Sequence, residues 1–406
     1  MSPAKDSSLL TPGSSLITPQ PSLLITGGAG FIGANFVRYW IKNYPDDRIV
    51  VLDALTYAGN KASLAGLENH PGFCFVKGDI RDYDLVLQLL QDHGINIIVN
   101  FAAESHVDRS IHGPDVFVET NIMGTHSLLK AAKNAWLDSP FSTRNSSPSS
   151  SPHSSLLTPH SRYRFHHIST DEVYGSLGPE DPAFSETTPY APNSPYAASK
   201  AGSDFLVRSY YKTYGLPMTI SNCSNNYGPY QHPEKLIPLL ILNCLETRPL
   251  PIYGDGLNIR DWLYVEDHCR GIDLILRKGR LGETYNIGGN CEKTNLKVVH
   301  TVCALLDELK PLSPQPSALR QSSAVSYADN PQSYSSLIRH VKDRPGHDRR
   351  YAIDASKITG ELAYEPVESF ESGMRKTVEW YLVNLKWCRN TMGEDYRKWI
   401  AQNYEA

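Results

Sequence analysis

Short apolar runs alternate with longer amphipathic segments along the first half of the chain. Leu23–Thr26 is a run of apolar residues followed by glycines, which is typical of a buried strand. In the next segment, Phe31–Asn43, apolar residues recur at helical spacing. The same alternation predicts strands at Ile49–Asp53, Phe73–Val76, Ile95–Asn100, Phe165–Ser169 and Met218–Ile220, and helices at Asp82–His93, Asp115–Trp136 and Tyr196–Tyr214.

This order of elements indicates an α/β fold. Strands that alternate with helices form parallel sheets, and the helices cover both faces of the sheet. We therefore expect a doubly wound parallel sheet of the Rossmann type over residues 22–227. From Gly228 onward the pattern is less regular, and we expect residues 228–406 to form mainly a smaller, mixed α/β C-terminal lobe that binds the substrate.

Three segments rich in Ser, Thr and Pro lack hydrophobic periodicity. They cover residues 1–21, 138–161 and 311–336, and such a composition cannot bury enough apolar surface to offset the entropy of ordering. We expect a disordered tail and two surface insertions. The sequence SSLLTP occurs at Ser7–Pro12 and again at Ser154–Pro159, either by coincidence of composition or as a docking or phosphorylation motif used twice.

Composition argues against several classes of function. The formal net charge is −4 over 406 residues, so no general attraction to nucleic acid or to an anionic membrane is expected. No apolar run approaches the roughly 20 residues that cross a bilayer, and no apolar signal region follows Met1. The seven cysteines are scattered, without Cys-x-x-Cys spacing, so we expect neither a metal site nor disulfides. A cytoplasmic protein fits these features.

A glycine-rich turn joins the first predicted strand to the first predicted helix. Gly27, Gly30 and Gly33 allow the backbone to approach a pyrophosphate and the helix to pack closely on the strand. Unpaired N–H groups at the helix N-terminus then face the phosphates. Asp53 ends the next strand, where a carboxylate accepts hydrogen bonds from ribose hydroxyls and repels a 2′-phosphate. The pattern predicts an NAD-binding domain over residues 22–227, with NAD favoured over NADP.

Tyr196 and Lys200 form a Tyr-x-x-x-Lys motif within a predicted helix. This spacing places both side chains on one face of the helix. A nearby ammonium, together with a positively charged nicotinamide, stabilises a tyrosinate and lowers the pKa of the tyrosine. Tyr196 is therefore a candidate base for a sugar hydroxyl as hydride leaves for the cofactor.

With these motifs the chain resembles the dTDP-glucose 4,6-dehydratases, a family of extended short-chain dehydrogenase/reductases. The resemblance covers about residues 22–380 and is interrupted by the Ser/Pro-rich segments. The matching motifs occur in order at 27–33 (GGAGFIG), 53–60 (DALTYAGN), 78–82 (GDIRD), 101–110 (FAAESHVDRS), 170–175 (TDEVYG), 224–229 (SNNYGP), 260–268 (RDWLYVEDH) and 343–348 (DRPGHD).

The resemblance implies removal of water from a nucleoside-diphosphate glucose to give a 4-keto-6-deoxy sugar. Oxidation at C4 acidifies the C5 proton, and loss of the C6 hydroxyl then needs a base at C5 and an acid at C6. Asp171 and Glu172 follow a predicted strand, whose end faces the ligand crevice in this fold. By resemblance Glu172 is the base, Asp171 is the acid, and Thr170 holds O4 beside Tyr196. The reaction returns its hydride to C6, so NAD should stay bound through turnover.

The same resemblance assigns further contacts to two ligands. NAD would lie against Gly27, Gly30, Phe31, Ile32, Gly33, Asp53, Ala54, Leu55, Thr56, Asp79, Ile80, Ala102, Ala103, Thr120, Tyr196, Lys200 and Asn226. The nucleotide sugar would be held by Ser105, Thr170, Asn225, Lys235, Leu236, Arg260, Asn295, Arg344 and His347. His106 fits a contact and a structural role equally well. Related enzymes dimerise through the helices that correspond to Asp115–Trp136 and Tyr196–Tyr214, so a homodimer is expected.

Other functions fit part of the pattern. A nucleotide-sugar 4-epimerase or decarboxylase on the same fold would use the cofactor and the Tyr-Lys pair, but it needs no acid and base together for water loss. A non-catalytic NAD-binding scaffold would use the Ser/Pro-rich segments as interaction arms, and its sequence would tolerate loss of Tyr196, Lys200 or Glu172. The sequence leaves open whether the nucleotide is dTDP or UDP.

Overall fold

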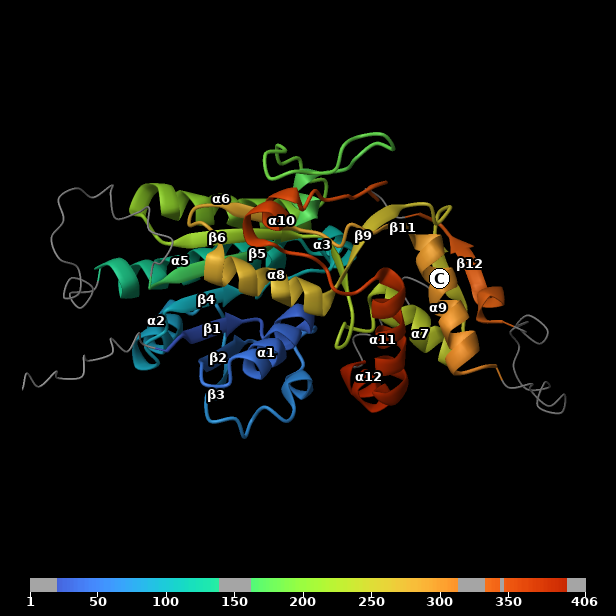
Figure 1. Ribbon diagram of the computed structural model, residues 1–406, viewed down its shortest axis with the longest axis horizontal. Coiled ribbons are helices and arrows are strands. Elements are labelled where there is room, and N and C mark those ends of the chain that lie inside the picture. Colours follow the sequence, from blue (N-terminus) through green and yellow to red (C-terminus); the bar gives the residue numbers. More distant parts are fainter. Residues whose placement is uncertain (1–19, 139–161, 313–332, 344–346, 393–406) are drawn as a thin grey trace, which may run out of the picture.

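A seven-stranded parallel sheet forms the centre of the larger lobe in the computed structural model, which describes residues 20–138, 162–312, 333–343 and 347–392 (Figure 1). The strand order is β10-β6-β5-β4-β1-β2-β3. This arrangement confirms the predicted doubly wound sheet. The strands are β1 (Ser22–Thr26), β2 (Arg48–Asp53), β3 (Phe73–Lys77), β4 (Ile97–Asn100), β5 (Arg164–Thr170), β6 (Met218–Cys223) and β10 (Thr284–Ile287).

Helices cover both faces of this sheet, and each face has its own apolar core. One face is covered by α1 (Phe31–Asn43), α8 (Val265–Lys278) and α10 (Ser356–Leu362), whose buried side chains form one cluster. The other face is covered by α2 (Tyr83–Asp92), α5 (Thr125–Lys133) and α6 (Pro195–Tyr214), which form another. Because both faces are buried, β1, β2 and β4 are mostly apolar, as the sequence pattern predicted, whereas β5, β6 and β10 also contain buried polar residues.

Polar residues interrupt the apolar strands at one level of the sheet. Thr26 of β1 lies beside Asn100 of β4, and Asn100 lies beside His167 of β5. All three side chains are buried. Three polar groups in neighbouring strands therefore form a row under the carboxyl ends of the strands.

The segment predicted as one helix, Asp115–Trp136, is helical but not uniformly α-helical. It consists of α4 (Asp115–Phe117), the π-helix η2 (Val118–Gly124), α5 and the π-helix η3 (Asn134–Asp138). The wide turn η2 directs the Asn121 side chain to the backbone N–H and carbonyl of Glu104. Gly124 lies so close to Ile80 that an added Cβ would come within 2.5 Å of its Cδ1 atom. Hydrophobic periodicity does not distinguish such wide turns from α-helical ones.

The smaller lobe is mixed α/β and is built around a third core. Its sheets have the orders β11-β9-β7 and β12-β8. The strands are β7 (Asn225–Tyr227), β8 (Leu250–Tyr253), β9 (Ile259–Tyr264), β11 (Glu292–Thr294) and β12 (Ile338–Val341), and the helices are α7 (Leu236–Leu245), α9 (Asn295–Leu309), α11 (Phe370–Val383) and α12 (Leu385–Thr391). Short elements complete the chain: α3 (Val107–His112), η1 (Lys61–Leu64), η6 (Asp171–Tyr174) and η8 (Tyr334–Leu337).

The chain crosses between the two lobes more than once. Strand β10 and helices α8 and α10 come from the part of the sequence assigned mainly to the substrate lobe, yet they pack in the larger lobe. Near the end of the expected insertion 311–336, Tyr334 is buried and donates its hydroxyl to the carbonyl of Lys310, so this part belongs to the smaller lobe's core. Both SSLLTP copies, nearly all of residues 1–21 and 138–161, and Arg344 lie outside the described residues.

Candidate active site

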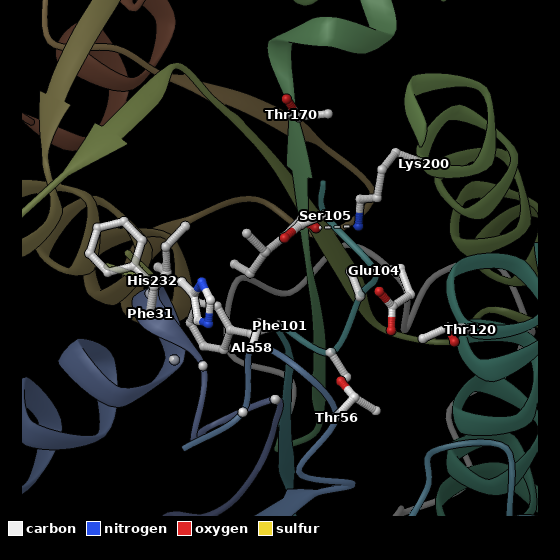
Figure 2. A pocket seen from close by; sticks show the side chains of 18 of the residues that line it. Phe31, Thr56, Ala58, Phe101, Glu104, Ser105, Thr120, Thr170, Lys200 and His232 are labelled. Atoms are coloured by element: carbon white, nitrogen blue, oxygen red, sulfur yellow. Dashed lines mark hydrogen bonds between the residues drawn. The ribbon is translucent and has the colours of Figure 1, made fainter. Parts of the chain in front are cut away.

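Two adjoining cavities lie where the carboxyl ends of the parallel strands meet the smaller lobe. The first has a volume of about 370 Å³ and is lined by the ends of β1, β2, β4, β5 and β6 (Figure 2). The second, of about 220 Å³, extends between α7, β8 and β9. Both cavities share Ser105, Glu172, Asn225 and Lys235 among their walls. A ligand could therefore extend from one cavity into the other.

The glycine turn forms one wall of the first cavity. Gly27 has a φ of 67°, and an added Cβ there would come within 2.6 Å of the Ala102 nitrogen. An added Cβ at Gly33 would come within 2.3 Å of the Gly27 carbonyl oxygen. The first α-helical hydrogen bond runs from Ala34 to Gly30, so the preceding N–H groups of α1 have no acceptor within the helix. This cradle fits the diphosphate of a dinucleotide.

Asp53 lies at the end of β2 and faces the same cavity. Its carboxylate accepts hydrogen bonds from the backbone N–H groups of Ala29 (2.9 Å) and Leu55 (2.8 Å). Burial raises the pKa of this carboxyl, and the two hydrogen bonds act against that rise. Asp53 therefore ties the glycine turn to β2 and retains lone pairs for a ribose hydroxyl. Leu55 was predicted to line the cofactor site, but it does not line the cavity: its φ is 55°, and its side chain packs on the core beside α1.

Most of the remaining residues predicted to contact the cofactor line the first cavity. They are Phe31, Ile32, Ala54, Thr56, Asp79, Ile80, Ala102, Ala103, Thr120, Tyr196, Lys200 and Asn226. The structure adds residues that the sequence analysis missed, notably Ala58, Phe101, Glu104 and His232 (Figure 2). Ala58, Phe101 and Glu104 lie inside the quoted motifs and could have been found there. His232 lies in a loop without a pattern.

Asp171 is a buried carboxyl group with little to stabilise its charge. It begins η6 after β5, and its side chain is 2% exposed. Its Oδ1 atom accepts a hydrogen bond from the Thr170 hydroxyl (3.3 Å), and its Oδ2 atom has no hydrogen-bond partner among the described residues. Burial, followed by the neighbouring charges of Glu172 and Asp261, raises the pKa of Asp171 well above its usual value. A carboxyl in this environment is suited to keep a proton and donate it.

Thr170 and Tyr196 line the same cavity, together with Glu172. Burial, together with the charge of Glu172, raises the pKa of Tyr196 well above its usual value. The Thr170 side chain acts in the opposite direction. A tyrosinate at this position therefore needs positive charge nearby.

Lys200 is one helical turn from Tyr196, but its hydrogen bonds go elsewhere. Its Nζ atom donates to the carbonyl of Ile168 (2.7 Å) and lies 3.3 Å from Nε2 of His167. Burial lowers the pKa of the amine to about 8, although the charge of Asp204 raises it. The buried ammonium takes the nearest backbone acceptor, so any effect of Lys200 on Tyr196 acts through space.

The residues predicted to hold the nucleotide sugar lie in the second cavity or at its border with the first. Leu236, Arg260, Asn295 and His347 line the second cavity, and Ser105, Asn225 and Lys235 line both. The Arg260 guanidinium lies 4.3 Å from the ring centre of Tyr351, and His347 Nδ1 lies 2.6 Å from Asp343 Oδ1. His106 lines the second cavity, and its Nε2 atom lies 3.8 Å from Glu234. His106 therefore contacts a neighbouring side chain and is also placed to contact a ligand.

The described part of the chain contains neither a candidate metal site nor a candidate membrane-spanning helix. It contains no cluster of His, Cys, Asp and Glu side chains that could hold a metal ion. None of its helices combines the length and the apolar character that crossing a membrane requires.

Known proteins share this arrangement. Residues 24–377 match the family model described as GDP-mannose 4,6 dehydratase. The dTDP-glucose 4,6-dehydratase of Salmonella typhimurium is 51% identical over 392 residues, covering 95% of this chain and 99% of the relative. The dTDP-glucose 4,6-dehydratase of Streptomyces venezuelae, solved with NAD and TYD bound, has a TM-score of 0.75 and 46% identity, covering 91% of this chain and 99% of that structure.

A 4-epimerase of known structure is less similar to this chain than the dehydratases are. The UDP-glucuronic acid 4-epimerase of Bacillus cereus, solved with UDP-glucuronic acid and NAD, has a TM-score of 0.71 and 27% identity, with 89% of this chain covered and 99% of that one. The fold is thus shared with epimerases, whereas about half of the sequence is shared with dehydratases. The chain belongs to the dTDP-glucose 4,6-dehydratase family.

Proposed function

We propose that this protein is an NAD-dependent hydro-lyase that converts dTDP-glucose to the 4-keto-6-deoxy sugar and water. One observation carries most of the weight: Asp171 is buried and its pKa is raised, while Glu172 lies next to it in the wall of the same cavity. Two adjacent carboxyl groups in unequal environments can act as acid and base in one elimination. Relatives at about 50% identity carry the same function in their names.

The first cavity suits NAD. The free N–H groups of α1 and the glycine turn would hold the diphosphate, and Asp53 would accept hydrogen bonds from the ribose. Lys200, Tyr196 and Thr120 line the same cavity. When bound, the nicotinamide supplies a hydride acceptor for C4 and later a hydride donor for C6.

The protein side chains account for the proton movements. Tyr196, next to Thr170, would take the proton of the C4 hydroxyl. Glu172 would then remove the C5 proton, which the C4 ketone has acidified. Asp171 would give its proton to the departing C6 hydroxyl, which leaves as water. Once hydride has been added at C6, Glu172 would return a proton to C5. The proton gained by Tyr196 and the proton lost by Asp171 would be exchanged through solvent. Replacement of the carbon–oxygen bond at C6 by a carbon–hydrogen bond balances the oxidation at C4, so no external oxidant is needed.

A 4-epimerase or decarboxylase would leave these carboxyl groups without a task. Neither reaction needs a proton donor at C6, yet Asp171 is held in an environment that favours the protonated form. Keeping such a group buried costs folding free energy, which is a common sign of function. The same argument disfavours a non-catalytic scaffold.

The second cavity would hold the nucleotide. Arg260, Asn295 and His347 line it, and Lys235 lies at the border where a diphosphate would pass. Cationic side chains suit that group. Competition between dTDP-glucose and UDP-glucose in one reaction tests the choice of base: we expect dTDP-glucose to be consumed first, and equal consumption would overturn that choice.

We also propose a homodimer. Exposed apolar side chains occur on η2 and α6, namely Val118, Met123, Phe205 and Tyr214. Exposed apolar side chains on neighbouring helices favour a second subunit as their cover. We place the enzyme in the cytoplasm, because all seven cysteines are free and several are buried without a disulfide partner.

A further inference from the structure

Helix α6 carries a second charged residue, Asp204, on the face that holds Tyr196 and Lys200. Asp204 follows Lys200 by four residues, so the three side chains lie one above another toward β5. All three are buried, and Asp204 is 0% exposed. The proposed reaction uses Tyr196 and Lys200 but gives Asp204 no task. A fully buried carboxylate needs partners that compensate for its lost hydration.

Asp204 is surrounded by donors. Its Oδ2 atom accepts hydrogen bonds from the hydroxyls of Ser169 (2.7 Å) and Tyr190 (3.0 Å). Its Oδ1 atom has no hydrogen-bond partner among the described residues and lies 3.4 Å from Nε2 of His167. That ring nitrogen also lies 3.3 Å from the Lys200 amine, so His167 is next to both Asp204 and Lys200.

The polar row across the sheet favours one tautomer of His167. The backbone N–H of Ala102 donates to the Thr26 hydroxyl (3.3 Å), which in turn donates to Asn100 Oδ1 (2.6 Å). The Asn100 amide group then faces Nδ1 of His167 at 3.1 Å and donates to it. The imidazole proton is left on Nε2, which lies 3.3 Å from the Ser203 hydroxyl oxygen and 3.4 Å from Asp204 Oδ1. Burial lowers the pKa of His167 to about 4, so the ring is neutral at ordinary pH.

We propose that Asp204, held by His167, Ser169 and Tyr190, is the buried counter-ion that keeps the Lys200 amine protonated beside Tyr196. Asp204 is thus a positioning residue that acts through Lys200. The inference rests on the proposed function for its catalytic consequence. The link between Asp204 and Lys200 rests on their i,i+4 spacing on α6 and on the His167 Nε2 atom that lies next to both, and the charge of Asp204 raises the pKa of the amine.

The surroundings of Lys200 leave Asp204 as its main source of negative charge. The ionisable groups that face the amine are Asp204 and Tyr196 from α6, His167 from β5 and Cys223 from β6. His167 is neutral, and burial raises the pKa of the Cys223 thiol to about 12, so neither supplies a negative charge at neutral pH. Burial alone would favour the neutral amine, which could not stabilise a tyrosinate.

Asp204→Asn tests this role, because it removes the charge while keeping the shape. Trace labelling with acetic anhydride, which reacts with the neutral amine, followed by mass spectrometry of the Lys200 peptide over a pH series, measures the proton equilibrium of Lys200 without substrate. We expect the midpoint to move to lower pH by about one unit or more. The alkaline limb of the pH profile of kcat/KM should move in the same direction.

Asp273→Asn is the matched control. Asp273 is a buried carboxylate on α8 that accepts hydrogen bonds from the hydroxyls of Tyr39 (2.9 Å) and Tyr44 (2.8 Å), so its loss resembles that of Asp204 without involving Lys200. We expect it to lower Tm but to leave the Lys200 midpoint and the pH profile unchanged. An unchanged Lys200 midpoint in Asp204→Asn, or an equal shift in both variants, would overturn the proposal.

A second variant covers the case in which Asp204→Asn does not fold. If the loss comes from an uncompensated ammonium, Lys200→Met combined with Asp204→Asn should recover folding, whereas failure to recover it contradicts the pairing. Failure of the wild-type enzyme to dehydrate dTDP-glucose would refute the proposed function, and the labelling result would still decide the role of Asp204.

Discussion

Asp171→Asn is the substitution that most sharply separates the steps of the proposed reaction. Asparagine keeps the shape of the side chain but has no proton to give at C6. Oxidation at C4 depends on Tyr196 and Lys200, so it should survive. The variant should therefore bind substrate and oxidise C4, but it should lose water slowly.

The structure sets the size of this effect. Asp171 Oδ2 is buried and has no hydrogen-bond partner among the described residues, so no neighbouring group is in place to replace it. Glu172 and Tyr196 are near, but both have other roles. General acid catalysis contributes about 10²- to 10⁴-fold, which corresponds to about 2.7 to 5.4 kcal/mol of activation free energy. We expect kcat to fall by about 10³-fold, near the middle of this range.

Rapid mixing with dTDP-glucose provides the assay. Reduced nicotinamide should build up on the variant, because oxidation continues while its reoxidation waits for elimination. In D2O, the sugar bound to Asp171→Asn should exchange its C5 hydrogen with solvent, since Glu172 is intact. Product formation at the wild-type rate would refute the assignment of Asp171 as the acid.

The Asp171→Asn variant should lose activity but gain folding stability relative to the wild-type protein. The folded-state pKa of Asp171 is raised, so the wild-type protein loses stability as pH rises above the unfolded value, about 4, toward the folded value. The variant has no such group. Its Tm relative to wild type should increase with pH, as often happens when a strained catalytic group is removed. A Tm difference that stays constant from pH 4 to neutral pH would contradict the raised pKa.

Four further outcomes follow from the same structure. Glu172→Gln should also accumulate reduced nicotinamide but should not exchange the C5 hydrogen in D2O, and normal exchange would exclude Glu172 as the base. Asp53→Ala should weaken NAD binding, reduce the preference over NADP, and cost about 1 to 3 kcal/mol of stability through two orphaned N–H groups, measured by titration and urea unfolding. Replacing residues 142–161 by a short Gly/Ser loop should leave kcat and Tm nearly unchanged. The reason is that the flanking elements, η3 and β5, meet the segment at the end of the sheet away from the cavities (Figure 1). Loss of activity in a variant that is folded and dimeric would refute this. Phe205→Asp should give a monomer by sedimentation at micromolar concentration, and a persistent dimer would place the interface elsewhere.

The sequence predicts those features of the fold and of the site that depend on local patterns of residues. Buried parallel strands are apolar runs, and the glycine turn and the Tyr196–Lys200 spacing have geometric consequences within one or two elements. The strands, the glycine turn and the Tyr196–Lys200 pair could all be found without a structure. Among the described residues that were quoted for the cofactor and the nucleotide sugar, all except Leu55 line the two cavities.

The rest depends on contacts between distant segments. The backbone of Leu55 turns into a left-handed conformation, which directs its side chain to the core, and no pattern in the sequence marks this turn. Strand β10 lies after residue 227 in the sequence but belongs to the large sheet. It pairs with β6 and not with β9 or β11, the strands nearest to it in sequence. The row from Thr26 to His167 is set by strand register, which a single sequence does not reveal.

The most direct test of the central claim follows one hydrogen atom. The purified enzyme, without added cofactor, is given dTDP-glucose deuterated at C4, and the product is examined by NMR and mass spectrometry. The account predicts a 4-keto-6-deoxy sugar that has lost one water and carries the deuterium at C6. Deuterium returned to C4 in an epimerised sugar, or lost to solvent, would contradict it.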